Sequence, residues 1–375
     1  TADEIEHQLN DAGAEIVVTL SSYYNRIHGI RGNTRLRHAI VTNIKEYFPA
    51  LLSVLFTLAR EKKEGHRVEV ASDDDFWFQS LLSESSPAPA PVEVDFEDTA
   101  CLIYTGGTTG VPKGAELSHR NVVSNAVAGG HWSHAQEAGE VSIGALPFFH
   151  SYGMTAAMNM TIAAASTMVL IPDPRDVKHV MGSISKHRAT FYSAVPTSYV
   201  RINTHPQVSE FDLSSVRVCL SGAAPLPLEV QERFQALTGS RLVEAFGMTE
   251  SSPATHVNPL DRNKLGTIGV PWPDTDARIV DLDTGEEELP QGDIGELIIR
   301  GPQVMKGYWR MPTETANVLR QHPSLGPGVW LHSGDIARMD REGYFQIVDR
   351  KKDMIICGGF NVYPRDIEDV LYKHP

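Results

Sequence analysis

The chain has 375 residues, with 47 acidic and 33 basic side chains and a formal net charge of −14. This acidity argues against a general nucleic-acid-binding protein, which would present a basic face. The length exceeds what one hydrophobic core usually serves, so we expect two or more domains. With 41% hydrophobic and 21% charged residues, the composition is that of an ordinary soluble globular protein.

Apolar segments with strand character alternate with helical patterns through the first two thirds of the chain. Strand candidates are 15–20, 39–42, 100–104, 142–146, 167–171, 190–195, 216–220 and 241–244, and helix candidates are 176–187 and 226–237. This alternation predicts an α/β fold whose layered subdomains contain largely parallel sheets covered by helices. In such sheets ligands bind beyond the carboxyl ends of the strands.

From about residue 266 the pattern changes to short strands with frequent turns, as at 277–280, 296–300 and 344–348. We therefore expect α/β subdomains over 1–265, a β-rich subdomain over 266–351 and the start of a further domain over 352–375. The stretch 83–91, rich in serine and proline, predicts an extended surface linker.

Two apolar segments bear on membrane contact. Residues 154–171 are about as long as the shortest span, but polar side chains interrupt them, so we expect a buried helix and then a strand. Residues 48–59 are too short to span and precede Arg60, Lys62, Lys63 and Arg67. We favour a surface helix with a solvated charged end; the alternative is peripheral contact of 48–67 with anionic headgroups.

The three cysteines, Cys101, Cys219 and Cys357, lie far apart and form no C-x-x-C pair. Neither a zinc site nor a disulfide framework is expected from this spacing. A reducing, cytoplasmic location fits it, with the inner face of the membrane as the alternative that goes with peripheral contact.

The most informative stretch, 104–114, reads YTGGTTGVPKG and follows an apolar segment. Glycines let backbone N–H groups approach an anion, and threonine hydroxyls and Lys113 add further donors. The spacing matches neither a Walker A loop nor a dinucleotide fingerprint. The stretch predicts a polyphosphate-binding loop, and the alternative is a Gly/Thr-rich surface loop.

This stretch resembles the signature loop of the adenylate-forming superfamily, which includes acyl-CoA synthetases, luciferases and peptide-synthetase adenylation domains. Further motifs follow in the family's order: LPFFH at 146–150, SGAAP at 221–225, FGMTE at 246–250, GEL at 295–297, GYW at 307–309, SGD at 333–335, DRKKD at 349–353 and GG at 358–359. The resemblance covers the chain from Glu4 onward and is closest to prokaryotic long-chain fatty acyl-CoA ligases. It implies that the β-rich region is a small distorted barrel.

The resemblance implies ATP-binding roles for several of these motifs. The residues that would contact ATP or AMP are Thr105, Gly106, Gly107, Thr108, Thr109, Gly110, Lys113, Gly222, Ala223, Ala224, Ala245, Phe246, Gly247, Met248, Thr249, Asp335 and Arg350. Phe246 would stack on adenine, Asp335 would accept hydrogen bonds from the ribose, and Arg350 would contact the ribose from the other side. Glu250 would be the Mg²⁺ ligand.

The same resemblance implies the catalytic and acyl-binding positions. The catalytic candidates are Lys113, His150, Thr249 and Glu250, and the candidates for the acyl pocket are His150, Met154, Gly222 and Ala245. Lys352 matches a hinge, and Gly358 with Gly359 would lie near CoA. Without the resemblance, Asp335 reads as a turn residue, Thr249–Glu250 as a helix N-cap and His150 as a core residue.

The implied reaction converts a carboxylate and ATP to acyl-AMP and pyrophosphate, after which the thiol of CoA takes the acyl group. The expected substrate is a long-chain fatty acid, with ATP and CoA as co-substrates and Mg²⁺ as cofactor. The alternatives are another acid (medium-chain, aromatic or carrier-protein-directed) and a non-catalytic nucleotide- or lipid-binding relative. The oligomeric state stays open, with a homodimer as one alternative.

Relatives of this superfamily are longer at both ends, and the chain starts without methionine and stops at Pro375 inside a helical pattern. We therefore expect a fragment that lacks the N-terminal start and most of a C-terminal α+β domain. The expected consequence is impaired acyl-AMP and acyl-CoA formation.

Overall fold

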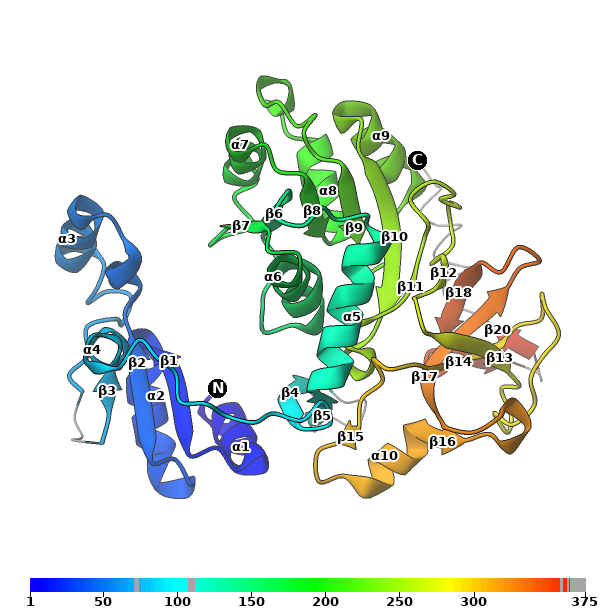
Figure 1. The fold of residues 1–375 in the computed structure, drawn as a ribbon, viewed down its shortest axis with the longest axis horizontal. Coiled ribbons are helices and arrows are strands. Elements are labelled where there is room, and N and C mark those ends of the chain that lie inside the picture. The colour runs from blue at the N-terminus through cyan, green and yellow to red at the C-terminus, as the bar shows by residue number, and fades with distance from the viewer. Residues whose placement is uncertain (71–73, 107–111, 358–359, 363, 365–375) are drawn as a thin grey trace. The chain divides into compact units, whose positions relative to one another are not determined.

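The computed structural model describes residues 1–70, 74–106, 112–357, 360–362 and 364. The chain divides into two compact units, Thr1–Val94 and Asp95–Pro375 (Figure 1). The strands expected from the alternating pattern form in both units, which confirms the α/β class.

The first unit is built on a parallel sheet in the order β1 (Ile16–Leu20), β2 (His38–Thr42), β3 (Phe76–Trp77). Its helices are α1 (Ala2–Ala12), α2 (Ser21–Ile30), α3 (Ala50–Ala59) and α4 (Phe78–Glu84), with short turns η1 (Arg31–Asn33) and η2 (Ile44–Tyr47). Tyr24, Ala39 and Val41 form its buried apolar cluster.

A buried carboxylate joins the elements of this first unit. Asp75 accepts hydrogen bonds from Tyr24 Oη at 2.9 Å, from Arg31 Nη1 at 2.8 Å and from the backbone N–H of Ala39 at 2.8 Å. Because Tyr24 and Arg31 come from the α2 and η1 region and Ala39 from β2, this one side chain fixes helix and sheet together.

The second unit contains a seven-stranded sheet in the order β12-β11-β10-β9-β8-β6-β7. The strands are β6 (Val141–Gly144), β7 (Thr167–Leu170), β8 (Phe191–Ala194), β9 (Val218–Ser221), β10 (Arg241–Gly247), β11 (Ala254–Val257) and β12 (Val270–Pro271). The run from β7 to β10 is parallel, and β11 and β12 add antiparallel edges.

The helices of the second unit alternate with these strands along the chain (Figure 1). They are α5 (His119–Trp132), the π-helical η3 (Gly153–Asn159), α6 (Met160–Ala163), α7 (Val177–His187), α8 (Pro196–Asn203) and α9 (Leu228–Thr238), with short turns η4 (Val208–Glu210) and η5 (Thr249–Ser251). The main core cluster includes Ile143, Met181, Tyr199, Phe234 and Leu242, all fully buried. It packs the helices onto the parallel strands.

Two antiparallel sheets complete the second unit. One has the order β15-β5-β4, from β4 (Thr99–Thr105), β5 (Lys113–Ser118) and β15 (Gly307–Tyr308). The other joins β13 (Asp276–Val280), β14 (Gly295–Arg300), β16 (Leu319–Gln321), β17 (Val329–Met339) and β18 (Phe345–Arg350). The remaining elements are α10 (Pro312–Val318), η6 (Pro323–Leu325) and the hairpin β19 (Ile355–Cys357) with β20 (Phe360–Val362).

The expected β-rich region is therefore confirmed as an antiparallel sheet, while its closure into a barrel and the boundary at 265 stay predictions. Residues 154–171 fold as expected into helical structure followed by β7. The chain from Ser85 to the start of β4 has no helix or strand, whereas Ser83 and Glu84 of the predicted linker belong to α4, so the linker stays a prediction. Within the described ranges no helix is long and apolar enough to span a membrane.

Candidate functional site

A cavity of about 830 Å³ lies in the second unit, at the ends of strands β4, β9, β10 and β18 and along β17. Segments far apart in the sequence line it together. The sequence-predicted residues among them are Thr105, Gly106, Lys113, His150, Gly222, Ala223, Ala245, Phe246, Gly247, Met248, Thr249, Glu250, Asp335, Arg350 and Lys352. The meeting of these motifs at one cavity agrees with the sequence expectation, although the glycine-rich run follows a strand of an antiparallel sheet.

The remaining candidates do not line this cavity. Gly107, Thr108, Thr109, Gly110, Gly358 and Gly359 lie outside the described residues. Ala224 is exposed and does not line the cavity wall. Met154 instead packs with the cluster of Ala115, Leu117 and Met305, so its position does not support an acyl-pocket role.

Two glycines bring the backbone close to neighbouring groups at the cavity. A Cβ on Gly247 would lie 2.0 Å from the carbonyl oxygen of Pro253, a distance no side chain can tolerate. A Cβ on Gly222 would lie 3.2 Å from the ring of Tyr152, whose hydroxyl donates to the carbonyl of Leu220 at 2.8 Å. The wall thus requires glycine at Gly247, whereas a side chain at Gly222 would need the Tyr152 ring to move by a few tenths of an ångström.

Lys113 begins β5 and points its ammonium group into a local network. Its Nζ forms an ion pair with Glu314 of α10 and lies 5.2 Å from the centroid of the Tyr308 ring. The Lys113 side chain is only 12% exposed, whereas that of Glu314 is 36% exposed. The predicted phosphate-binding cation therefore has an acidic partner in this conformation.

Glu250 lies in η5 and is held from two sides. Its Oε1 accepts a hydrogen bond from Tyr308 Oη at 2.7 Å, and its backbone carbonyl accepts from the N–H of Met305 at 2.8 Å. Burial and the negative charge of Glu250 raise the pKa of Tyr308, so this hydroxyl stays protonated and donates. Next to it, Thr249 Oγ1 lies 3.4 Å from Ser151 Oγ.

Asp335 and Arg350 pair across β17 and β18. The Arg350 Nε lies 3.7 Å from Asp335 Oδ1, which is too long for a strong hydrogen bond. Burial raises the pKa of Asp335 to about 6, with Arg350 acting against the shift and Glu296 and Glu250 adding to it. Asp335 is thus a buried carboxylate that this pairing satisfies only in part.

Comparison with known proteins identifies the group to which this arrangement belongs. The AMP-binding enzyme family matches residues 1–309. The chain belongs to this family. A long-chain-fatty-acid–CoA ligase from Bacillus subtilis (strain 168) is 40% identical over 379 residues, covering 100% of this chain and 66% of the relative. A ligase of the same name from Escherichia coli O6:H1 is 36% identical with the same coverage.

A solved structure agrees with the family membership. The crystal structure of ATP-bound MatB from Rhodopseudomonas palustris superposes with a TM-score of 0.82 at 31% identity, covering 100% of this chain and 67% of that one. The chain thus spans 66% of the length of the two curated relatives. Fold and family are shared over its whole length.

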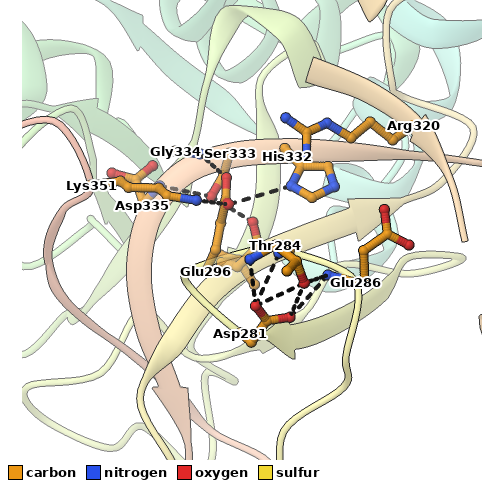
Figure 2. Close-up of polar contacts among 12 residues, drawn as sticks. Asp281, Thr284, Glu286, Glu296, Arg320, His332, Ser333, Gly334, Asp335 and Lys351 are labelled. Carbon is orange, nitrogen blue, oxygen red and sulfur yellow. Dashed lines mark hydrogen bonds and ion pairs between the residues drawn. The ribbon is translucent and has the colours of Figure 1, made fainter. Parts of the chain in front are cut away.

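Glu296, in the motif GEL at 295–297, has a contact network that the sequence did not reveal. Figure 2 shows Glu296 between Lys351, His332 and the backbone of Gly334. Its oxygens lie 2.9 Å from Lys351 Nζ, 3.4 Å from His332 Nδ1 and 3.2 Å from the Gly334 nitrogen. Burial acts to raise the pKa of Glu296, but its contacts with His332 and Lys351 lower it to about 2.

This network connects the two segments that carry the predicted ribose contacts. Gly334 precedes Asp335 in β17, and Lys351 follows Arg350 at the end of β18. Because Glu296 bonds both, it fixes their spacing. The motif's place in the family order was the available signal, but its partners 38 and 55 residues away could not be derived from spacing.

Proposed function

We propose that the protein activates a long-chain fatty acid, using ATP to make acyl-AMP and then CoA to make acyl-CoA. The observation that carries this proposal is the convergence of Lys113, Glu250, Asp335 and Arg350 on one cavity of about 830 Å³. A fully apolar lipid pocket would have no use for these charges, which suit a nucleotide.

The two ends of the cavity support different parts of the nucleotide. Thr105, Gly106 and Lys113 lie at the glycine-rich run, where a triphosphate would be held by backbone N–H groups and an ammonium group. Asp335 still has acceptor capacity for the ribose hydroxyls, since its nearest cation is 3.7 Å away. Phe246 also lines the cavity, and its ring would stack on adenine.

The residues present also suit a magnesium ion. A hard cation bound with a nucleotide takes one or two carboxylates together with phosphate oxygens, and Glu250 offers one such carboxylate to the cavity. When bound, Mg²⁺ would withdraw negative charge from the departing pyrophosphate. The Tyr308 hydroxyl, by donating to Oε1, orients this carboxylate.

The chemistry needs no nucleophile from the protein. A carboxylate oxygen of the fatty acid attacks the α-phosphorus, the bond to pyrophosphate breaks, and acyl-AMP forms. The CoA thiol then attacks the acyl carbon and AMP leaves with that oxygen. Lys113 would stabilise charge on pyrophosphate, Thr249 would bind the α-phosphate or the acid, and His150 would lie where the three substrates meet.

The acid is inferred from the relatives, because both curated ligases are named for long-chain fatty acids. Each methylene that enters an apolar tunnel contributes about 0.8 kcal/mol, so chain length is a natural basis for selectivity. The co-substrates ATP and CoA support the predicted cytoplasmic location. The hinge at Lys352, CoA contact at Gly358 and Gly359, and a homodimer stay predictions.

The test is exchange of labelled pyrophosphate into ATP with a panel of acids, measured on a protein extended to the length of the curated relatives, of which this chain spans 66%. We expect stimulation by palmitate well above that by hexanoate or benzoate. Stimulation by benzoate alone would replace the fatty acid with an aromatic one. ATP binding without exchange for any acid would instead indicate a non-catalytic relative.

A further inference from the structure

Helix α3 in the first unit exposes the side chains that helices normally bury. Its sequence is ALLSVLFTLA, and among its large apolar residues only Phe56, 7% exposed, is buried. The exposed ones are Leu51 at 72%, Leu52 at 52%, Val54 at 57%, Leu55 at 51% and Leu58 at 80%. Single exposed leucines are ordinary, but a contiguous group marks a surface that binds something apolar.

Four of the five exposed residues share one face of the helix, and Leu52 lies beside it. Positions 51, 54, 55 and 58 follow the i, i+3, i+4, i+7 spacing of a single helical stripe. Phe56 lies on the opposite side, by the same geometry. We call Leu51, Val54, Leu55 and Leu58 the α3 face.

The helix is anchored through its other side. The Phe56 ring lies 5.5 Å from that of Phe48 and 5.7 Å from that of His66, and His66 Nδ1 contacts Ser21 Oγ at 2.9 Å. Just after the helix, buried Glu61 accepts a hydrogen bond from Asn43 Nδ2 at 2.9 Å. These contacts hold α3 with the α3 face turned outward.

A basic segment follows the α3 face directly. Arg60, Lys62, Lys63 and Arg67 are all exposed, and we call these four residues the basic turn. Arg60 has exposed Glu64 at 3.6 Å, whereas Lys62, Lys63 and Arg67 form no ion pair in the part of the chain that the structure describes. This cluster stands out on a chain whose net charge is −14.

We propose that the α3 face and the basic turn dock on an anionic lipid bilayer. Leucine and valine side chains would enter the boundary between headgroups and acyl chains, while the lysines and arginines meet lipid phosphates. A second copy of the chain is the alternative occupant of the α3 face, and the test below distinguishes it from a bilayer. Such docking would place the protein at the bilayer, into which long-chain fatty acids partition. The docking proposal does not depend on the proposed function.

Vesicle flotation tests the proposal with the intact protein. Wild-type protein should bind vesicles of phosphatidylcholine with phosphatidylglycerol at least tenfold better than vesicles of phosphatidylcholine alone, and added salt should weaken the binding. The triple variant Leu51→Gln, Leu55→Gln, Leu58→Gln should lose at least tenfold on anionic vesicles. The variant Lys62→Glu, Lys63→Glu should lose the preference for anionic lipid.

A matched control uses exposed leucines elsewhere. Leu228→Gln with Leu237→Gln changes side chains on α9 that are 48% and 43% exposed, and vesicle binding should not change. Circular dichroism and ATP affinity should be the same in all variants, which separates docking from nucleotide binding. Wild-type protein that ignores anionic vesicles, or a triple variant that binds like wild type, would overturn the proposal. A triple variant that turns a dimer into a monomer would assign the surface to a second copy.

Discussion

Each unit places side chains where proteins rarely have them: the second unit buries charged side chains, and the first exposes large apolar ones. In the second unit, the carboxylates Glu296 and Asp335 are buried beside a cavity, at 4% and 9% exposure. In the first unit, Leu51 and Leu58 of α3 are exposed at 72% and 80%. Both arrangements are unfavourable for an isolated chain, because buried charge loses hydration and exposed leucine orders water.

These side chains differ in whether other groups of the chain contact them favourably. Glu296 is satisfied by Lys351 and the Gly334 backbone, so its burial is structural. The carboxylate of Asp335 has Arg350 at 3.7 Å and the charge of Lys352 nearby but no hydrogen-bond donor among the described residues, and the α3 face is exposed. Side chains without such favourable contacts indicate a binding partner, polar for Asp335 and apolar for α3.

Glu250→Gln should have the largest effect of the changes at the cavity. It removes one negative charge while keeping an oxygen that can accept from Tyr308, so the fold should persist. Magnesium-dependent ATP–pyrophosphate exchange should fall about 10²- to 10³-fold, the usual loss when one electrostatic contact is removed. Adenosine affinity should be unchanged as a control. Exchange within twofold of wild type would contradict the metal assignment.

Asp335→Ala tests the partner inferred for the uncompensated carboxylate. Hydrogen bonds to a charged group contribute about 1.5–3 kcal/mol each, so ATP and AMP should both bind about ten- to a hundredfold more weakly. Calorimetric titration of both nucleotides measures this directly. A loss limited to the fatty acid would show that Asp335 does not contact the ribose.

The raised pKa of Asp335 predicts a pH dependence. Adenosine, which has the ribose but no phosphate, should bind more weakly as pH falls through about 6, because the protonated carboxyl accepts poorly. The Asp335→Asn variant should bind adenosine weakly, and its affinity should not change with pH over this range. Since burial raises the folded-state pKa above 3.8, stability from this group is present below 3.8 and lost as pH rises through about 6. Equal pH profiles for both proteins would contradict the account.

Glu314→Gln should have a smaller effect than these changes, and it should strengthen ATP binding rather than weaken it. Glu314 pairs with Lys113, so ATP must displace this carboxylate to reach the ammonium group. Removing its charge should tighten ATP binding severalfold, about the value of a partly exposed ion pair. Adenosine, which lacks phosphates, is the matched ligand and should bind as before. Weaker ATP binding would mean that Glu314 positions Lys113 for the phosphates.

The sequence predicted most strands, because local alternation determines them, and many residues of its short motifs line one cavity, while their roles stay predictions. Met154 shows a limit: its packing against Ala115, Leu117 and Met305 depends on residues far away in the sequence, which no local pattern contains. The ion pair of Lys113 with Glu314 joins residues 201 positions apart, beyond any local pattern. The direction of the α3 face likewise depends on packing of Phe56, so both interpretations of 48–67 stayed open.

The central claim is that a carboxylate attacks the α-phosphorus of ATP in this cavity. The most direct test supplies palmitate labelled with ¹⁸O in its carboxylate and traps the acyl group with CoA or hydroxylamine. The account predicts AMP that carries one ¹⁸O, with unlabelled pyrophosphate, because the bridging oxygen stays on phosphorus when the acyl group leaves. Formation of ADP with ¹⁸O in inorganic phosphate, or of AMP without label, would contradict it.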